Sequence, residues 1–163
     1  MKLINSILVY IDDSDSVIEA IEYAIMLSQI HGAKLYGLYV VNTKALNDLL
    51  HAKIFIESEQ AEYAKELSDD GDRYLKTAMK LASSKGININ TIKKEGSPVS
   101  EIRNFCEEQD IDLLIIGSDG DSRFKSAREE LRSIKELTSI RVACNVLIVK
   151  ENEKIDRIFS LGE

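Results

Sequence analysis

The sequence predicts an α/β fold, a doubly wound five-stranded parallel sheet with helices on both faces. Short apolar runs rich in β-branched residues alternate along the chain with longer segments in which apolar residues recur every three or four positions. The first pattern is typical of parallel strands that are covered on both faces, and the second of amphipathic helices. Regular alternation of the two, with short connections, favours one sheet between two layers of helices.

Length and composition limit the classes of protein that this chain can be. The 163 residues fit one domain, 1–150, with a short C-terminal tail, 151–163. A chain that is 44% hydrophobic and 30% charged, with one proline, is typical of a soluble globular protein. The net charge of −7 argues against nucleic acid or an anionic membrane as a partner. No apolar window reaches the roughly 20 residues that a membrane span needs.

Two cysteines and the apolar segment near the N-terminus indicate the cellular compartment of the protein. Cys106 and Cys144 each adjoin an apolar segment, so we expect reduced, buried thiols, with a regulatory thiol pair as the alternative. The apolar run near the N-terminus meets two aspartates after Ile11, too early for the core and cleavage site of a signal peptide. The sequence therefore predicts a cytoplasmic protein.

The first β-to-α step is predicted within residues 3–31. Residues 3–11 form a nearly continuous apolar run, which indicates a buried strand. Apolar residues then recur at three- and four-residue spacing to about residue 31, which indicates an amphipathic helix. We expect Asp13 or Ser14 to cap this helix and Gly32 to end it.

The next segments predict a second strand and a long helix. Residues 34–41 have strand character, whereas residues 42–56 are the least regular part of the chain. Over residues 57–85, apolar residues keep to one stripe and charged residues fill the other, so one long helix is expected. Gly71 lies within this helix and weakens it slightly.

Two further β-to-α steps and a last strand complete the predicted sheet. Residues 87–95 alternate as in a strand with one wetter face, and a helix begins at Ser97, a potential cap, and Pro98. A fourth strand at 113–116 runs into a glycine-containing loop, a helix follows, and the last strand is 145–149. The inward-facing residues expected in these two helices are Val99, Ile102, Phe105, Cys106, Leu131, Ile134 and Leu137.

Two strand ends carry residues suited to a ligand. In a doubly wound sheet, ligands bind beyond the carboxyl ends of the strands, where the strand order reverses. Asp12 follows the first strand, and Gly117 and Gly120 follow the fourth in G-x-x-G spacing. Glycine takes positive φ and lacks a side chain, so such a loop can bring backbone N–H groups up to an anion. A tight turn at the glycines and a helix cap at Asp12 are the structural alternatives.

Five pieces of the chain extend the pattern from about Leu3 to Lys150. They are ILVYIDDSDSVIEAIEYAIMLS, LYGLYVV, EGSPVSEI, DLLIIGSDG and RVACNVLIVK. In this order they resemble segments of the universal stress protein family. The first resembles the family's opening strand, aspartate and first helix, the second resembles its second strand, and the third resembles its third-helix entry. The last two together resemble its close. The resemblance implies a Rossmann-like fold of the adenine nucleotide alpha hydrolase-like type.

The resemblance also implies a nucleotide site. Members of the nucleotide-binding type carry G-x-x-G, nine residues, then Gly and Ser or Thr, a loop that holds the phosphates and ribose of ATP. Gly117 and Gly120 match the first half, and Ser133 matches the final hydroxyl residue. Arg132 stands at the position of the third glycine, and the spacing from Gly120 is eleven residues, so the second half of the motif is broken.

Further positions follow from the same resemblance. It places Asp12, with the adjoining Ile11, beside the nucleotide, and the backbone at Val40 against the adenine. The acidic Asp119 and Asp121 would repel a phosphate, whereas a divalent cation such as Mg²⁺ could bridge carboxylate and phosphate. The basic residues that could fold back onto an anion, or form a wet face, are Arg123, Lys125, Arg128 and Arg132.

These observations predict a non-catalytic, stress-response regulatory domain with a degenerate nucleotide cleft, in which ATP binding is weak or lost. The alternative is a functional universal stress protein that binds ATP or AMP, with Mg²⁺, as a nucleotide-dependent switch. A third class, an enzyme or a phospho-acceptor domain, lacks support, because the third strand ends in Lys93, Lys94 and Glu95 without an acceptor aspartate. Neither His31 nor His51 belongs to a catalytic or metal-ligand pattern.

The last strand and the tail predict how the chain assembles. An apolar strand at the edge of a sheet invites pairing with another chain, and the family commonly dimerises through it. We therefore expect a homodimer through Val146, Leu147, Ile148 and Val149. In the tail, apolar residues recur at spacings that fit one short amphipathic helix. We expect it to dock on its own or a neighbouring subunit, with a disordered tail as the alternative.

Overall fold

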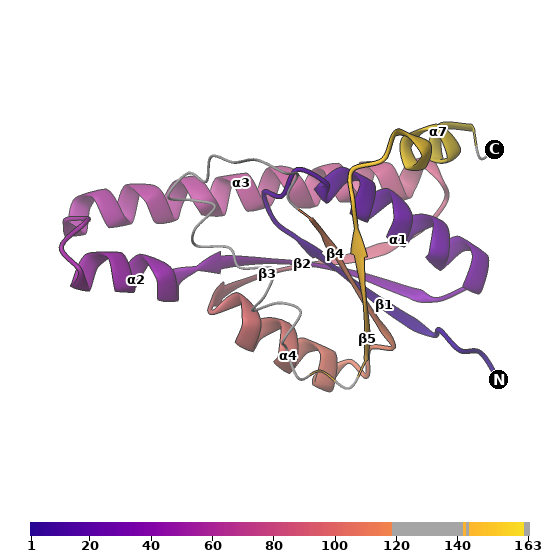
Figure 1. The fold of residues 1–163 in the computed structure, drawn as a ribbon, viewed down its shortest axis with the longest axis horizontal. Helices are drawn as coiled ribbons and strands as arrows, with labels where there is room; N and C mark the ends of the chain where they lie inside the picture. The colour runs from indigo at the N-terminus through magenta and orange to yellow at the C-terminus, as the bar shows by residue number, and fades with distance from the viewer. Residues whose placement is uncertain (119–141, 143, 162–163) are drawn as a thin grey trace.

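The computed structural model describes residues 1–118, 142 and 144–161. These residues form one five-stranded sheet with the strand order β3-β2-β1-β4-β5 (Figure 1). Every pair of neighbouring strands is parallel, which confirms the predicted fold class. The strands are β1 (Ser6–Ile11), β2 (Lys34–Asn42), β3 (Ile89–Gly96), β4 (Leu113–Gly117) and β5 (Asn145–Val149).

Helices cover both faces of the sheet. Figure 1 shows α1 and α3 on one face, with α7 beside α1, and α4 on the other. The helices are α1 (Val17–His31), α2 (Thr43–His51), α3 (Glu57–Ser84), α4 (Pro98–Glu108) and α7 (Glu153–Leu161). No helix of the described ranges has the length and apolar character that crossing a membrane requires.

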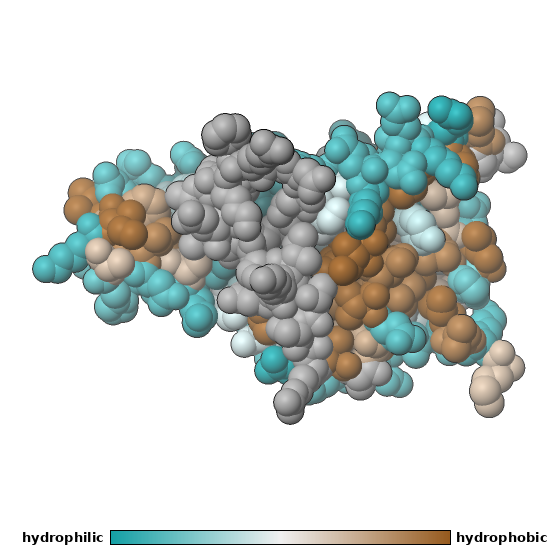
Figure 2. Space-filling view, in the orientation of Figure 1, coloured by the Kyte–Doolittle hydropathy of each residue, from teal (hydrophilic) through white to brown (hydrophobic). Residues whose placement is uncertain are grey.

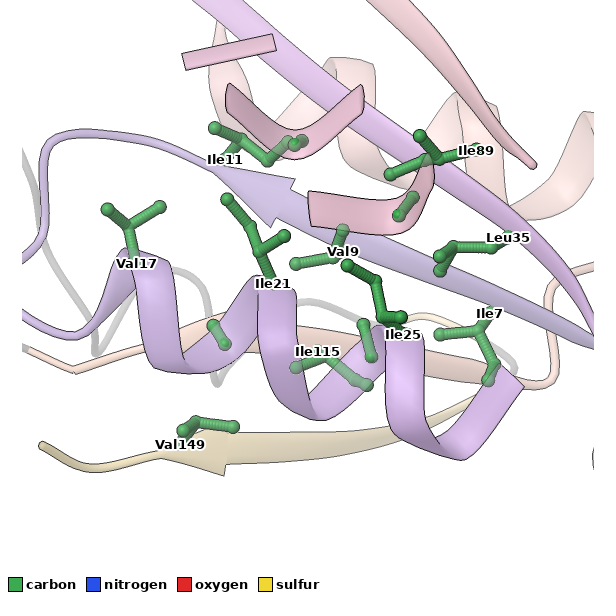
Figure 3. Close-up of a cluster of buried hydrophobic side chains, with 14 of the residues drawn as sticks. Ile7, Val9, Ile11, Val17, Ile21, Ile25, Leu35, Ile89, Ile115 and Val149 are labelled. Atoms are coloured by element: carbon green, nitrogen blue, oxygen red, sulfur yellow. The ribbon is translucent and has the colours of Figure 1, made fainter. Parts of the chain in front are cut away.

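The continuous apolar run of β1 is explained by two cores, one on each side. Ile7, Val9 and Ile11 point into the cluster beneath α1 and α3, as Figure 3 shows. Leu8 and Tyr10 point the other way, into the cluster beneath α4. Because successive side chains of a strand face opposite sides, a strand buried on both faces has no polar alternation.

The start of α1 differs from the prediction. The residue at the N-cap is Ser16 rather than Asp13 or Ser14, and its side chain makes no capping hydrogen bond. The N–H of Ser14 instead donates to Oδ1 of Asp12 over 3.0 Å, so a side-chain turn precedes the helix. The end of α1 is as predicted, because Gly32 has φ of 61° and closes the helix.

Residues 42–56 contain a helix that the prediction missed. The side chain of Asn42 accepts a hydrogen bond from the N–H of Ala45 over 3.0 Å and so caps α2. The helix packs beside α3, where Gln60 Nε2 donates to Asn47 Oδ1 over 2.8 Å. A nine-residue helix is too short to be stable alone in water, so its contact with α3 helps to stabilise it.

Most other boundaries fall within two residues of the predicted ones. The first strand is an exception, since it begins at Ser6 and Leu3 is exposed. Pro98 is the first residue of α4, although Ser97 makes no side-chain capping bond. In α4, Ile102, Phe105 and Cys106 are buried as expected, and Val99 is half-buried. The predicted helix with Leu131, Ile134 and Leu137 lies outside the described residues.

Both cysteines are free thiols on the α4 side of the sheet. Cys106 is buried as predicted, whereas Cys144 is only half-buried. A hydrogen bond from the Cys106 thiol to Cys144, together with burial, raises the pKa of Cys106. The same hydrogen bond lowers the pKa of Cys144 to about 7, against the opposing effect of its own burial.

Candidate functional site

The strand order reverses between β1 and β4. β1 pairs with β2 on one side and with β4 on the other, while the chain runs from β1 to β2 and only later returns to β4. The carboxyl ends of these strands, at Ile11 and Gly117, therefore lie side by side. This is the position at which doubly wound sheets bind ligands.

Gly117 is needed for space rather than for an unusual backbone angle. Its φ does not lie in the left-handed region that favours glycine. A Cβ atom built on Gly117 would lie 2.6 Å from Oγ of Ser14 and 3.0 Å from the carbonyl carbon and oxygen of Ser16. The expected positive φ is therefore wrong for Gly117, and the space that its missing side chain leaves is used by the β1–α1 loop, which packs against β4.

Backbone N–H groups at this strand end are used within the protein. The N–H of Ser16 donates to the carbonyl of Ser118 over 3.3 Å, and the N–H of Ser118 donates to the carbonyl of Val149 over 2.9 Å. The N–H of Ser14 is bonded to Asp12, and that of Val17 donates to the carbonyl of Ser14 over 3.2 Å. These bonds tie the β1–α1 loop to β4, and β4 to β5.

Two serine side chains at the same strand end differ in their hydrogen bonding from the backbone N–H groups there. Ser14 and Ser16 are buried, and neither hydroxyl has a hydrogen-bond partner in the part of the chain that the structure describes. Both lie just before α1, where the helix dipole favours negative charge. The sequence predicts a role for Ser14 only as a helix cap and none for Ser16. The pattern Ser-x-Ser between a buried strand and a helix was the available signal.

Asp12 lies where the sequence placed it, at the end of β1. Its side chain is buried, and Oδ1 accepts the hydrogen bond from the N–H of Ser14. The acidic group thus holds the turn that leads into α1, at the end of the helix where the dipole stabilises an acid. In the contacts that the structure describes, Asp12 stabilises the turn before α1. Its position after β1 also places it at the carboxyl ends of the strands, where doubly wound sheets bind ligands.

Ile11 and Val40 are both core residues, on opposite faces of the sheet. Ile11 packs in the cluster beneath α1 and α3, and Val40 in the cluster beneath α4. The backbone at Val40 lies past the end of β1, although the Val40 side chain belongs to the core. β2 pairs with β1 only as far as Tyr39, but with β3 as far as Asn42, so residues 40–42 of β2 continue past the end of β1.

The remaining predicted site residues are not placed by the structure. Asp119, Gly120, Arg132 and Ser133 lie outside the described residues. Within the ranges that are described, no group of three or more His, Cys, Asp or Glu side chains is arranged to hold a metal ion. His51 is bound locally, with Nδ1 lying 2.8 Å from the carbonyl oxygen of Asn47.

Comparisons with known proteins agree with this architecture. Residues 4–150 match the model of the universal stress protein family. Universal stress protein YxiE of Bacillus subtilis is 32% identical over 154 residues, which cover 91% of this chain and all of YxiE.

Two solved structures share the fold at lower identity. The universal stress protein UspA from Lactobacillus plantarum superimposes with a TM-score of 0.67 at 22% identity, covering 91% of this chain and 99% of UspA. A universal stress protein in complex with cAMP superimposes with a TM-score of 0.62 at 20% identity, covering 91% of this chain and 98% of the other. With its strand reversal between β1 and β4 and its match over residues 4–150, the chain belongs to the universal stress protein family.

Proposed function

We propose that this chain is a non-catalytic, stress-response regulatory domain whose cleft between β1 and β4 binds ATP weakly or not at all. The main support is that the N–H groups of Ser14, Ser16 and Ser118 are already hydrogen-bonded within the protein. Backbone N–H groups of this kind are what a strand end and a helix start offer to phosphates. A phosphate could use them only by displacing internal hydrogen bonds, each with a net contribution of about 1 kcal/mol.

Acidic residues are a second reason to expect weak binding of phosphate groups. Asp12 is buried beside these N–H groups, and the sequence of the glycine loop adds Asp119 and Asp121. A carboxylate about 4 Å from a phosphate charge costs about 1 kcal/mol in water and about 4 kcal/mol at an effective dielectric of 20. Mg²⁺ shared between carboxylate and phosphate would reverse this repulsion, so any ATP binding should depend on the cation.

A second candidate function is a nucleotide-dependent switch that binds an AMP-type ligand. The unpartnered hydroxyls of Ser14 and Ser16 favour it, because a hydroxyl can donate to a phosphate oxygen without breaking a backbone bond. The continuation of β2 past β1 at Val40 offers backbone to a base. The complex of a universal stress protein with cAMP makes an AMP-type ligand a suitable probe.

Titration followed by amide NMR separates the two candidates. The probes are ATP with and without Mg²⁺, AMP, and inorganic tripolyphosphate, and the reporters are the amides of residues 14–17 and 40–42. We expect ATP and tripolyphosphate to shift the amides of 14–17 only toward millimolar concentrations, a binding energy of about 4 kcal/mol. We also expect no phosphate release above background.

The AMP titration has a matched control. If AMP saturates both sets of amides at far lower concentration than ATP, and Ser16→Ala weakens that binding, the second candidate replaces the first. Ser6→Ala changes a serine that bonds the carbonyl of Asp110, away from the ligand edge, and should leave AMP binding unchanged.

We also propose a symmetric homodimer through β5. This strand ends the sheet order, with β4 as its neighbour on one side. Val146 and Leu147 are half-buried and Ile148 is exposed, and Figure 2 shows hydrophobic surface over this part of the molecule. Paired edges would bury these side chains and satisfy the backbone groups of the edge.

Sedimentation velocity tests the dimer. We expect the wild type to sediment as a dimer at tens of micromolar, and Ile148→Asp to shift it to the monomer, because a charge would lose its water at the interface. Ile54→Asp is the control, since Ile54 is exposed in the turn between α2 and α3, at the far end of the molecule from β5 (Figure 1). A monomeric wild type, or equal effects of the two substitutions, would contradict the proposal.

A further inference from the structure

The helix α7 depends on its docking site for its structure. It has nine residues, fewer than an isolated helix needs to be stable in water. Ile155 and Phe159 are buried in the cluster shared with α1 and α3, whereas Ile158 and Leu161 are exposed. Nζ of Lys85, at the end of α3, lies 4.8 Å from the centre of the Phe159 ring. The order of the tail is therefore a measure of whether it is docked.

A pair of acidic side chains joins α7 to α1. Glu22 of α1 is only 5% exposed, and it lines the same hollow as Asp156 of α7, where the two helices are in contact. Ionised carboxylates accept hydrogen bonds and donate none, so the two carboxyl groups can bond to each other only while the pair holds a proton. The other charged groups that face Glu22 are Glu19, one turn earlier on α1, and Lys85 of the α3 end.

Solvent reaches this pair. Glu22, Lys85 and Asp156 line an open hollow of about 480 Å³ between α1, the end of α3 and α7. A proton can thus leave or return without the core opening. The contact between α1 and α7 combines apolar burial, which does not depend on pH, with a pair of acidic side chains whose interaction does.

We propose that the proton shared by Glu22 and Asp156 acts as a latch, which holds α7 on α1 and releases it when rising pH removes the proton. The tail then leaves the apolar surface that Ile155 and Phe159 cover. This inference concerns the tail alone and does not depend on whether the cleft binds a nucleotide.

The pH window follows from the titration of Glu22. Burial, the hydrogen bond to Asp156 and the charges of Asp156 and Glu19 raise its pKa from 4.5 to about 8, while Lys85 acts in the opposite sense. The docked state therefore binds the proton more tightly than the released state. Docking is strongest below pH 4.5, weakens as the pH rises toward 8, and is constant above that. Within the window, the docking constant falls about tenfold for each pH unit.

Methyl NMR of α7, with carboxyl NMR of Glu22, tests the latch on the full chain from about pH 5 to pH 9.5. The methyl shift of the buried Ile155 reports docking, and that of the exposed Ile158 is the internal reference. We expect Ile155 to move to its solvent-exposed shift over the range in which Glu22 ionises. Glu22→Gln, which can donate to Asp156 but cannot ionise, should keep Ile155 at the docked shift throughout.

Glu19→Gln is the matched control, because it changes a neighbouring buried acid on α1 and leaves the Glu22–Asp156 pair intact. It should retain the pH-dependent release, over a range that lies lower because the charge of Glu19 no longer raises the pKa of Glu22. The proposal would be overturned if Ile155 stays at the docked shift above pH 9, or if the wild type and Glu22→Gln show the same pH dependence. A Glu22 carboxyl that titrates near its ordinary value while α7 is docked would overturn it as well.

Discussion

Gly117→Ala should lower the free energy of unfolding by about 2–3 kcal/mol, near the top of the range for overpacked sites. The added methyl group would lie 2.6 Å from Oγ of Ser14 and 3.0 Å from the carbonyl group of Ser16. The hydroxyl can rotate away, but the backbone of Ser16 is held by its hydrogen bond to Ser118. Relief of the contact therefore requires β4 and the start of α1 to move apart.

Urea denaturation followed by circular dichroism measures this loss. Gly86→Ala is the control, because a methyl group there meets no atom within 4 Å and suffers only from the left-handed φ of 68°. That strain costs about 1 kcal/mol. A Gly117→Ala protein as stable as Gly86→Ala, or more stable, would show that the β1–α1 loop adapts freely to β4.

This contact changes how variants of the glycine can be used. By sequence, Gly117→Val should block a ligand by filling the space that a phosphate approaches. In the structure, the same side chain would first displace Ser14 and Ser16, so lost binding would report damage to the fold. Ser16→Ala removes an unpartnered hydroxyl without adding atoms, and is the better probe of the cleft.

Gly71→Ala should destabilise the protein by about 1–2 kcal/mol, although alanine is the better helix former by about 1 kcal/mol. Gly71 is buried in α3 where the helix crosses β2. A Cβ atom there would lie 2.5 Å from Cδ1 and 2.6 Å from Cε1 of Tyr39. That ring is buried and stacks on Tyr74 with 6.4 Å between centroids, so it cannot move aside at low cost.

The control for Gly71 is Asp69→Ala, an exposed position two residues earlier on the same helix. It should stabilise the protein by a few tenths of a kcal/mol through helix propensity alone. Opposite signs for the two variants in the same urea experiment are the expected result. A stabilised Gly71→Ala protein would mean that propensity outweighs the contact with Tyr39.

Much of the fold could be predicted because the signals are local. A buried parallel strand such as β4 has a continuous apolar run, and the long helix α3 repeats its stripe over many turns, so their bounds agree with the prediction to within one residue. The short α2 has no such repeat. The start of α1 depends on which N–H the Asp12 side chain accepts, and the sequence allowed several choices.

The candidate site was predictable only in outline. Parallel topology brings Asp12 and Gly117 to one edge, and that follows from the order of the strands. The bonds that occupy the N–H groups of Ser16 and Ser118 join segments distant in sequence, so no spacing reveals them. The same holds for the Glu22–Asp156 pair, whose members lie on helices from opposite ends of the chain.

We expect the cleft of this family member to hold ATP weakly, because its backbone donors are already bonded within the protein. Isothermal titration calorimetry with ATP in excess Mg²⁺ tests it most directly. The expected result is a dissociation constant above roughly 100 μM, or no measurable heat. A submicromolar dissociation constant would contradict this expectation.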